Sequence, residues 1–150
     1  MKDRFDSEQI SQLADEFLEI AKKFNDYRFE KISQQKISHD TFLEMGKKSN
    51  QLMKTAREMK LLSTLIVGEE TATALSKLSS INQEIKGSIN SLIDIQKAFD
   101  FIGALGDIGL AIVEKNPAAI GNNISYIGEL LKETTSWKWQ IKKRKMQTSL

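Results

Sequence analysis

The chain has 150 residues, of which 40% are hydrophobic and 28% are charged, with one proline and no cysteine. This composition excludes a disordered chain, a disulfide-stapled fold, thiolate metal sites and a thiol nucleophile, and it is typical of one helix-rich domain. The net charge of +2 conceals an asymmetry, because residues 132–150 carry six Lys or Arg against one Glu, whereas residues 1–131 carry 16 against 19. The basic character is therefore confined to the C-terminal end.

No targeting or membrane-spanning segment is predicted. The opening MKDRFDSEQI has charges where a signal peptide needs an apolar core. The most apolar window, residues 98–113, is 16 residues long and contains Asp100 and Asp107, whereas a spanning helix needs about 20 apolar residues. Together with the lack of cysteine, this favours a cytoplasmic protein, with a peripheral location at the membrane as the alternative.

The first periodic segment spans residues 10–27. Its apolar residues recur every three or four positions, which is typical of one helix face, and Ser7 is the predicted N-cap residue. The stripe is regular enough to form a heptad seam with a second copy of the chain, so self-association is one expectation. Its members are Ile10, Leu13, Phe17, Ile20, Phe24 and Tyr27.

A second helix is predicted from about residue 40 to residue 66, with Gly68 as its stop. Ser38 or Asp40 is expected to cap its first turn. Methionines at helical spacing form an adaptable groove in some proteins, but more often they are core residues, which is the interpretation we prefer for Met53 and its neighbours. The apolar face contains Phe42, Met45, Leu52, Ala56, Met59 and Ile66.

A third apolar pattern runs from residue 71 to residue 113. It is longer than a helix of a compact bundle needs to be, so we expect a break near Gly87 or Gly103.

The last helix is predicted to begin at NPAAI, where Asn116 is the cap and Pro117 takes the first helical position. With no alternating strand pattern, the sequence predicts an all-α fold: an up-and-down antiparallel bundle of four or five helices. We expect the bundle domain to occupy residues 1–135 and a basic C-terminal tail to occupy residues 136–150.

The stretch FIGALGDIGLAIVEKNPAAIGNNI, residues 101–124, fits either a tightly packed helical hairpin or one that enters a membrane. Asp100, Asp107 and Glu114 fall in one stripe on a helical wheel, which predicts an acidic rim at the water-facing edge of a buried helix. Glycines on both helices would let their axes approach closely, at about 1 kcal/mol each in lost helix propensity. These glycines are Gly103, Gly106, Gly109, Gly121 and Gly128.

An apolar hairpin rich in glycine and alanine also suits a bundle that opens and inserts into a bilayer. Over residues 99–131, the two apolar helices and their short turn resemble in composition the hairpins of helical cell-death and pore-forming domains, including those of bacterial and fungal signalling systems. That resemblance implies a membrane-acting effector that exposes this hairpin.

The tail SWKWQIKKRKMQTSL combines tryptophans with clustered cations, namely Trp137, Lys138, Trp139, Lys142, Lys143, Arg144 and Lys145. Indoles favour the membrane interface and clustered cations favour anionic lipid, so an anionic membrane surface is one expected partner. Nucleic acid, held through its phosphates and a stacked base, is a partner we rank lower. A third interpretation is structural, because cations stabilise a helix C-terminus.

The sequence contains no catalytic or cofactor motif. His39 is the sole histidine, and the acid pairs Glu16 with Glu19 and Glu69 with Glu70 lack the Glu-x-x-His motifs of a di-metal bundle. No phosphate-binding glycine loop or nucleophile elbow occurs. We therefore expect a non-enzymatic interaction or signalling module that binds a protein partner and uses no cofactor or metal.

Overall fold

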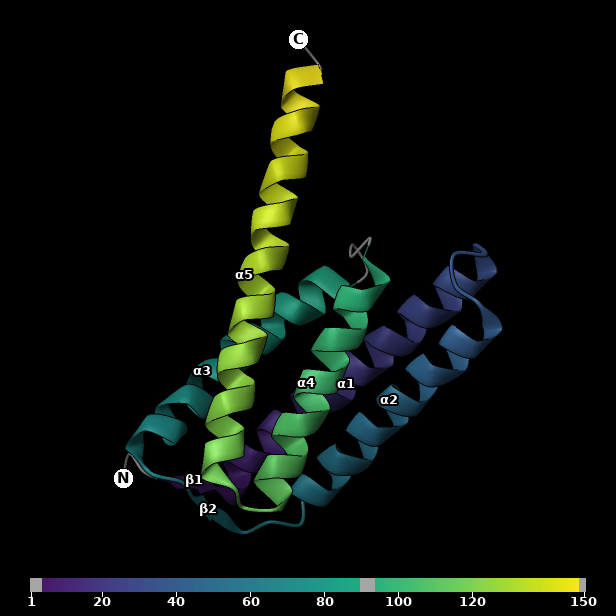
Figure 1. Ribbon diagram of the computed structural model, residues 1–150. Coiled ribbons are helices and arrows are strands. Elements are labelled where there is room, and N and C mark those ends of the chain that lie inside the picture. The colour runs from purple at the N-terminus through teal and green to yellow at the C-terminus, as the bar shows by residue number, and fades with distance from the viewer. Residues whose placement is uncertain (1–3, 90–93, 149–150) are drawn as a thin grey trace.

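The computed structural model describes the backbone of residues 4–89 and 94–148 and the side chains of residues 4–89 and 94–132. Within those ranges it contains five α-helices and two short strands (Figure 1). The predicted all-α bundle of four or five helices is confirmed in its five-helix form. The elements are β1 (Arg4–Asp6), α1 (Ser7–Ser33), α2 (His39–Met59), β2 (Thr64–Ile66), α3 (Glu69–Ser88), α4 (Ile95–Val113) and α5 (Pro117–Thr148).

The order of the helices in space differs from their order in the chain. α1 and α2 form one antiparallel hairpin, α4 and α5 form another, and α2 packs against α4 (Figure 1). α3 contacts α1 on one side and α5 on the other. α2 and α3, which are consecutive in the chain, are therefore not principal neighbours, and α4 is flanked by both α2 and α5.

The local sequence determines where the first two helices begin. The N-cap residue of α1 is Asp6 rather than the predicted Ser7, because the Gln9 amide donates to the Asp6 carboxylate at 2.8 Å and the Gln9 side chain accepts from the Asp6 amide at 3.0 Å. This reciprocal pair is a capping box, and its carboxylate also interacts favourably with the helix dipole. Ser38 caps α2 as predicted, since it accepts from the Thr41 amide at 3.1 Å.

The first helices of both hairpins end in the same way. Gln35 and Lys115 each adopt a left-handed backbone with a φ of 57°. In each turn the amide of the next residue donates to the carbonyl five residues back, at 2.9 Å. This Schellman pattern satisfies carbonyls that the end of a helix leaves unpaired. The Asn116 side chain then accepts from the backbone at the start of α5, with Pro117 first in the helix, as predicted.

A short strand replaces the end of the second predicted helix. α2 ends at Met59, and Thr64–Ile66 pairs antiparallel with Arg4–Asp6 so that Phe5 lies opposite Leu65. Phe5 and Leu65 are buried, whereas the flanking strand residues are exposed. The prediction of a helix to residue 66 is wrong, because Thr, Leu and Ile suit a strand as soon as a partner strand from the N-terminus lies beside them.

The long third pattern is divided between α3 and α4. α3 ends at Ser88, directly after Gly87, so the predicted break near this glycine is confirmed. α4 begins after Asp94, whose carboxylate accepts from the Gln96 amide at 2.9 Å. Gly103, the other candidate for the break, lies inside α4.

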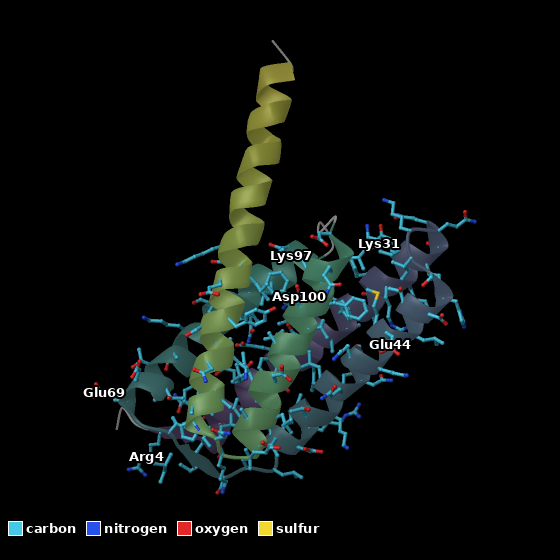
Figure 2. The ribbon with its side chains drawn as sticks, in the orientation of Figure 1. Arg4, Lys31, Glu44, Glu69, Lys97 and Asp100 are labelled. Atoms are coloured by element: carbon cyan, nitrogen blue, oxygen red, sulfur yellow. The ribbon has the colours of Figure 1, made fainter. Side chains whose placement is uncertain are left out.

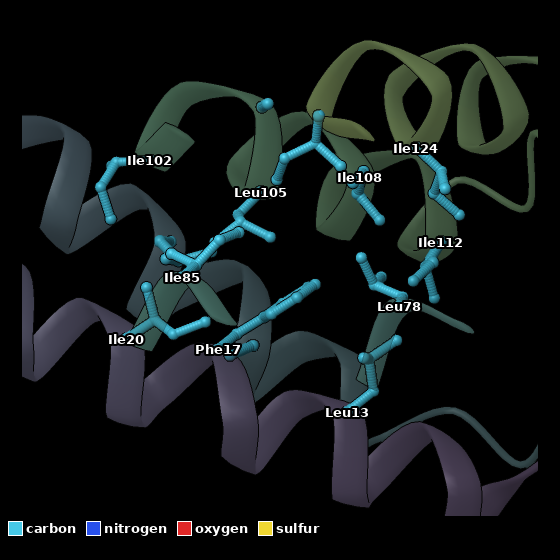
Figure 3. Packing of buried hydrophobic residues seen from close by; sticks show 14 of the residues in the cluster. Leu13, Phe17, Ile20, Leu78, Ile85, Ile102, Leu105, Ile108, Ile112 and Ile124 are labelled. Atoms are coloured by element: carbon cyan, nitrogen blue, oxygen red, sulfur yellow. The ribbon is translucent and has the colours of Figure 1, made fainter. Parts of the chain in front are cut away.

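One face of each helix contributes to a common core (Figure 3). All six residues of the first apolar stripe, from Ile10 to Tyr27, are at most 3% exposed. The stripe is therefore used within one chain, which corrects the expectation that it forms a seam with a second copy. Met45 and Met59 are fully buried, in agreement with core methionines. Figure 3 shows side chains of α1 pointing toward those of α3 and α4, among them Leu13, Phe17, Ile20, Leu78, Ile85 and Leu105.

Candidate interaction surfaces

Exposed apolar side chains gather at the end of the α1–α2 hairpin, where Figure 2 places Lys31 and Glu44. Phe29 is 56% exposed and Leu43 is 48% exposed, whereas Phe42 is half-buried. The Phe29 and Phe42 rings meet edge to face, with their centroids 5.0 Å apart and an interplanar angle of 75°. We define the aromatic tip as Arg28, Phe29, Phe42 and Leu43.

Arg28 connects the two rings of the aromatic tip. Its guanidinium carbon lies 4.3 Å from the Phe42 ring centroid and 4.8 Å from the Phe29 ring centroid. Nε donates to the Asn25 side-chain oxygen at 2.9 Å, and Nη1 donates to the Phe42 carbonyl at 3.3 Å. Gly46 leaves room for this arrangement, since a methyl group there would lie 3.0 Å from the guanidinium carbon. Arg28 is thus fixed across the hairpin by stacking and hydrogen bonding.

The Arg28 charge is not balanced by a carboxylate of the described residues. Its burial lowers the pKa of the Arg28 guanidinium, although an arginine stays protonated in a protein. A partly desolvated cation whose hydrogen bonds go to neutral oxygens is suited to a carboxylate from outside the chain.

The aromatic tip is not visible in the sequence pattern, for a geometric reason. Arg28 and Phe29 lie off the apolar stripe of α1, and Phe42 belongs to another helix, so no periodicity connects them. The available signal was the presence of Phe29 immediately after the stripe, with aromatic residues on both sides of a short connection. Only the hairpin geometry brings these side chains together.

The glycines of the α4–α5 hairpin do not form the predicted close contact. A methyl group at Gly103, Gly106, Gly121 or Gly128 would meet no atom within 4 Å. Three of these positions, Gly103, Gly121 and Gly128, are only half-buried. The structure therefore does not support the interpretation that these four glycines allow a close approach of α4 and α5, because a side chain would find open space at each of them.

Gly109 differs from the other four because it faces α2. A Cβ atom at Gly109 would lie 2.6 Å from Thr55 Cγ2 and 3.5 Å from both Thr55 Cβ and the Met59 sulfur. Atoms in a close-packed interior cannot approach to 2.6 Å without displacement. The close approach that the glycines permit is therefore between α2 and α4, at this one position.

The predicted acidic rim lies at the surface. Asp107 and Glu114 are exposed, and Asp100 is half-buried, with its carboxylate accepting from the Gln96 side chain at 3.0 Å. These three acids mark the edge of α4 that faces neither α2 nor the core, as expected for a buried helix with one edge in water.

The basic and aromatic tail lies outside the described side chains, so the expected functions of its residues stay predictions. α5 continues through the expected domain boundary at residue 135 without interruption, and its second half extends beyond the other helices in Figure 1. The tail residues concerned are Trp137, Lys138, Trp139, Lys142, Lys143, Arg144 and Lys145.

The residues that the structure describes contain neither a metal-ligand cluster nor a membrane-crossing helix. Within those residues, His, Cys, Asp and Glu side chains form no group of three that could hold a metal ion. None of the described helical segments is long and apolar enough to cross a bilayer. His39 is exposed beside the Ser38 cap, and Glu69 and Glu70 are exposed at the start of α3.

The fold and its surfaces define a five-helix bundle with a small two-stranded sheet and an exposed aromatic tip. Comparisons of the chain with protein-family models, with curated proteins and with solved structures found no match.

Proposed function

We propose that this protein is a non-enzymatic interaction module that binds a protein partner through the aromatic tip. The observation that carries the proposal is the exposure of Phe29 beside Arg28, whose charge no described carboxylate neutralises, with the exposed Leu43 next to Phe42 in the chain. Aromatic residues and arginine are the types that contribute most to the energy of protein interfaces. A partner that presents an apolar side chain next to a carboxylate is complementary to this surface.

Arg28 is held in a defined position within the aromatic tip. Because Arg28 is held by two hydrogen bonds and by contacts with both rings, association costs little side-chain entropy at this position. A cytoplasmic setting is part of the proposal and is supported by the absence of cysteine from the sequence.

Photo-crosslinking from two positions would identify the partner. A photoreactive residue at Leu43 reports what contacts the aromatic tip, and the same residue at Leu61, which is 86% exposed just after the other end of α2, is the matched control. Affinity of the purified partner is then compared for Phe29→Ser, Arg28→Gln and Leu61→Ser. We expect Phe29→Ser to weaken binding by about 30-fold, as for an interface hot spot, and Leu61→Ser to leave it unchanged.

The same experiment covers self-association. If the captured partner is a second copy of the chain, sedimentation should show a concentration-dependent dimer that Phe29→Ser abolishes. Equal capture from Leu43 and Leu61, or an affinity that neither tip variant changes, would refute the proposal.

A second candidate function is favoured by the open glycines of the α4–α5 hairpin. Each of the four costs about 1 kcal/mol relative to alanine, and in this bundle close packing does not compensate for that cost. A hairpin of weakened helices, one of which, α4, is apolar around most of its circumference, suits a bundle that opens at an anionic membrane, with the basic tail as the docking segment.

An engineered disulfide tests whether α4 must leave α2 for such an activity. A Cβ atom at Gly109 lies 3.5 Å from Thr55 Cβ, at the short end of the range for disulfides, and the chain has no cysteine of its own. The oxidised Thr55→Cys/Gly109→Cys protein should bind anionic vesicles without releasing a trapped dye, and reduction should restore release. The Thr55→Cys single variant controls for the thiol.

Salt provides the second arm of this experiment. Vesicle binding through the basic tail should weaken as the salt concentration rises, because the attraction between cations and anionic lipid is screened. Equal dye release by the oxidised and reduced forms, or no binding of the wild-type protein to anionic vesicles at low salt, would exclude the membrane function.

A further inference from the structure

We infer that the groove between β1, α1 and α3 binds a protonated amine carried on a short apolar stem. The groove has a volume of about 190 Å³, which is large beside the roughly 30 Å³ that one water molecule occupies. Its lining includes the Glu16 carboxylate, the Ser79 hydroxyl and the apolar side chains Phe5, Leu13 and Leu75.

The Glu16 carboxylate is oriented by neutral donors. The Ser79 hydroxyl donates to Oε1, and the Asn82 side-chain nitrogen donates to Oε2 at 2.8 Å. Asn82 is only 1% exposed, and its carbonyl oxygen accepts no hydrogen bond from the described residues. The hydrogen bonds fix the direction of the carboxylate, but they leave its charge unneutralised.

The neighbouring acids of α1 differ from Glu16, because each of them is paired with a cation. Asp15 forms an ion pair with Lys60, and Glu19 forms an ion pair with Lys86. Glu16 lies between them and is half-buried, yet it has no cation within ion-pair distance among the described residues. A carboxylate in a partly enclosed site interacts more strongly with a cation than an exposed carboxylate does, because water screens it less.

The rest of the groove selects the kind of cation. An ammonium group has three donors, which Glu16 and the side-chain oxygen of Gln12 in the groove wall can accept. Its alkyl stem would lie against Phe5, Leu13 and Leu75, and removing that stem from water adds to the binding energy. A bare metal ion fits less well, since it prefers several oxygen ligands and the groove offers one carboxylate. Free alkylamines and lysine side chains share this chemistry.

Titration of the isotope-labelled protein with butylammonium chloride, followed by amide NMR, tests the inference directly. We expect saturable shifts at residues 9–16 and 75–82 with a Kd of about 1–10 mM, as suits a ligand of five heavy atoms. Butanol, which has the stem without the charge, should give no saturable shift. A lysine residue capped at both ends distinguishes the source: shifts of equal affinity indicate a protein lysine, and shifts with butylammonium alone indicate a free amine.

Three variants establish where the amine binds. Glu16→Gln removes the charge and should weaken binding by at least about 10-fold, the effect of one lost charge-assisted contact, whereas Glu19→Gln should not change it. Ser76→Trp fills the groove from its α3 side without altering Glu16 or its donors, and it should abolish binding even if Glu16→Gln perturbs folding. Absence of saturable shifts in the wild-type protein, or shifts that persist in both Glu16→Gln and Ser76→Trp, would overturn the inference.

Discussion

Replacing Gly109 with alanine should destabilise the protein, whereas the same replacement at Gly106 should stabilise it. Both glycines are buried in the interior of α4. Alanine is favoured over glycine in a helix interior by about 1 kcal/mol. The added methyl group meets no atom within 4 Å at Gly106, but at Gly109 it would lie 2.6 Å from Thr55 Cγ2.

The magnitudes follow from these two effects. At Gly106 only the helix propensity changes, so the free energy of unfolding should rise by about 1 kcal/mol. At Gly109 the same gain is opposed by overpacking, which costs roughly 1–3 kcal/mol in a well-packed core. The net result lies between no change and a loss of about 2 kcal/mol, and the difference between the two variants equals the overpacking energy.

Urea unfolding followed by circular dichroism measures both variants. A third variant isolates the clash, because Thr55→Ser removes Cγ2 and keeps the hydroxyl that donates to the Gln51 carbonyl at 2.8 Å. In the Thr55→Ser background, Gly109→Ala should become stabilising. The difference between its effects in the two backgrounds is a coupling energy, as expected for residues in contact. If Gly109→Ala proved as stabilising as Gly106→Ala in the wild-type background, the close approach of α2 to α4 at Gly109 would be refuted.

Three further predictions follow from the helix ends and from the core. Asp6→Ala should lower the free energy of unfolding by about 1 kcal/mol and Ser7→Ala by much less, since the first removes the capping box; equal losses would contradict the assignment of the cap. Lys115→Gly should raise the free energy of unfolding by about 1 kcal/mol, because φ is 57° there and glycine adopts this left-handed backbone without steric cost. Lys115→Ala should not raise it. Burial, Asp94 and Glu30 raise the pKa of Tyr27 to about 12, so the unfolded state loses the Tyr27 proton first and stability should fall as the pH rises from 10 to 12. This loss of stability should be smaller in Tyr27→Phe, as measured by unfolding at each pH. An identical pH dependence in both proteins would contradict the raised pKa of Tyr27.

The core of α1 was predictable because its signal is local. Residues from Ile10 to Tyr27 repeat at helical spacing, and the structure buries every member of the stripe. The caps were less predictable, since Asp6 and Ser7 are both good N-cap residues and the choice depends on which of them engages Gln9. The cap at Asn116 was clear because Pro117 restricts where that helix can begin.

Features that depend on two distant segments could not be predicted in this way. Thr64–Ile66 becomes a strand only because Arg4–Asp6 lies beside it. The aromatic tip needs Phe29 and Phe42 to meet across the hairpin. Glu16 is conspicuous only when its ion-paired neighbours on α1 are seen.

The glycines of α4 show why a helical wheel alone was insufficient. α4 is apolar around most of its circumference because it packs against both α2 and α5, so its periodicity does not reveal which neighbour a given glycine faces. Opening of the α4–α5 hairpin would therefore have to separate α4 from α2, where Thr55 leaves less room for a Cβ atom at Gly109 than is found at any other glycine of the described residues. If the protein acts on membranes, the α2–α4 interface, rather than the turn at Lys115, is where the resistance to opening should lie. A stabilising substitution at Gly106 should then slow dye release less than the disulfide between positions 55 and 109, which prevents that separation.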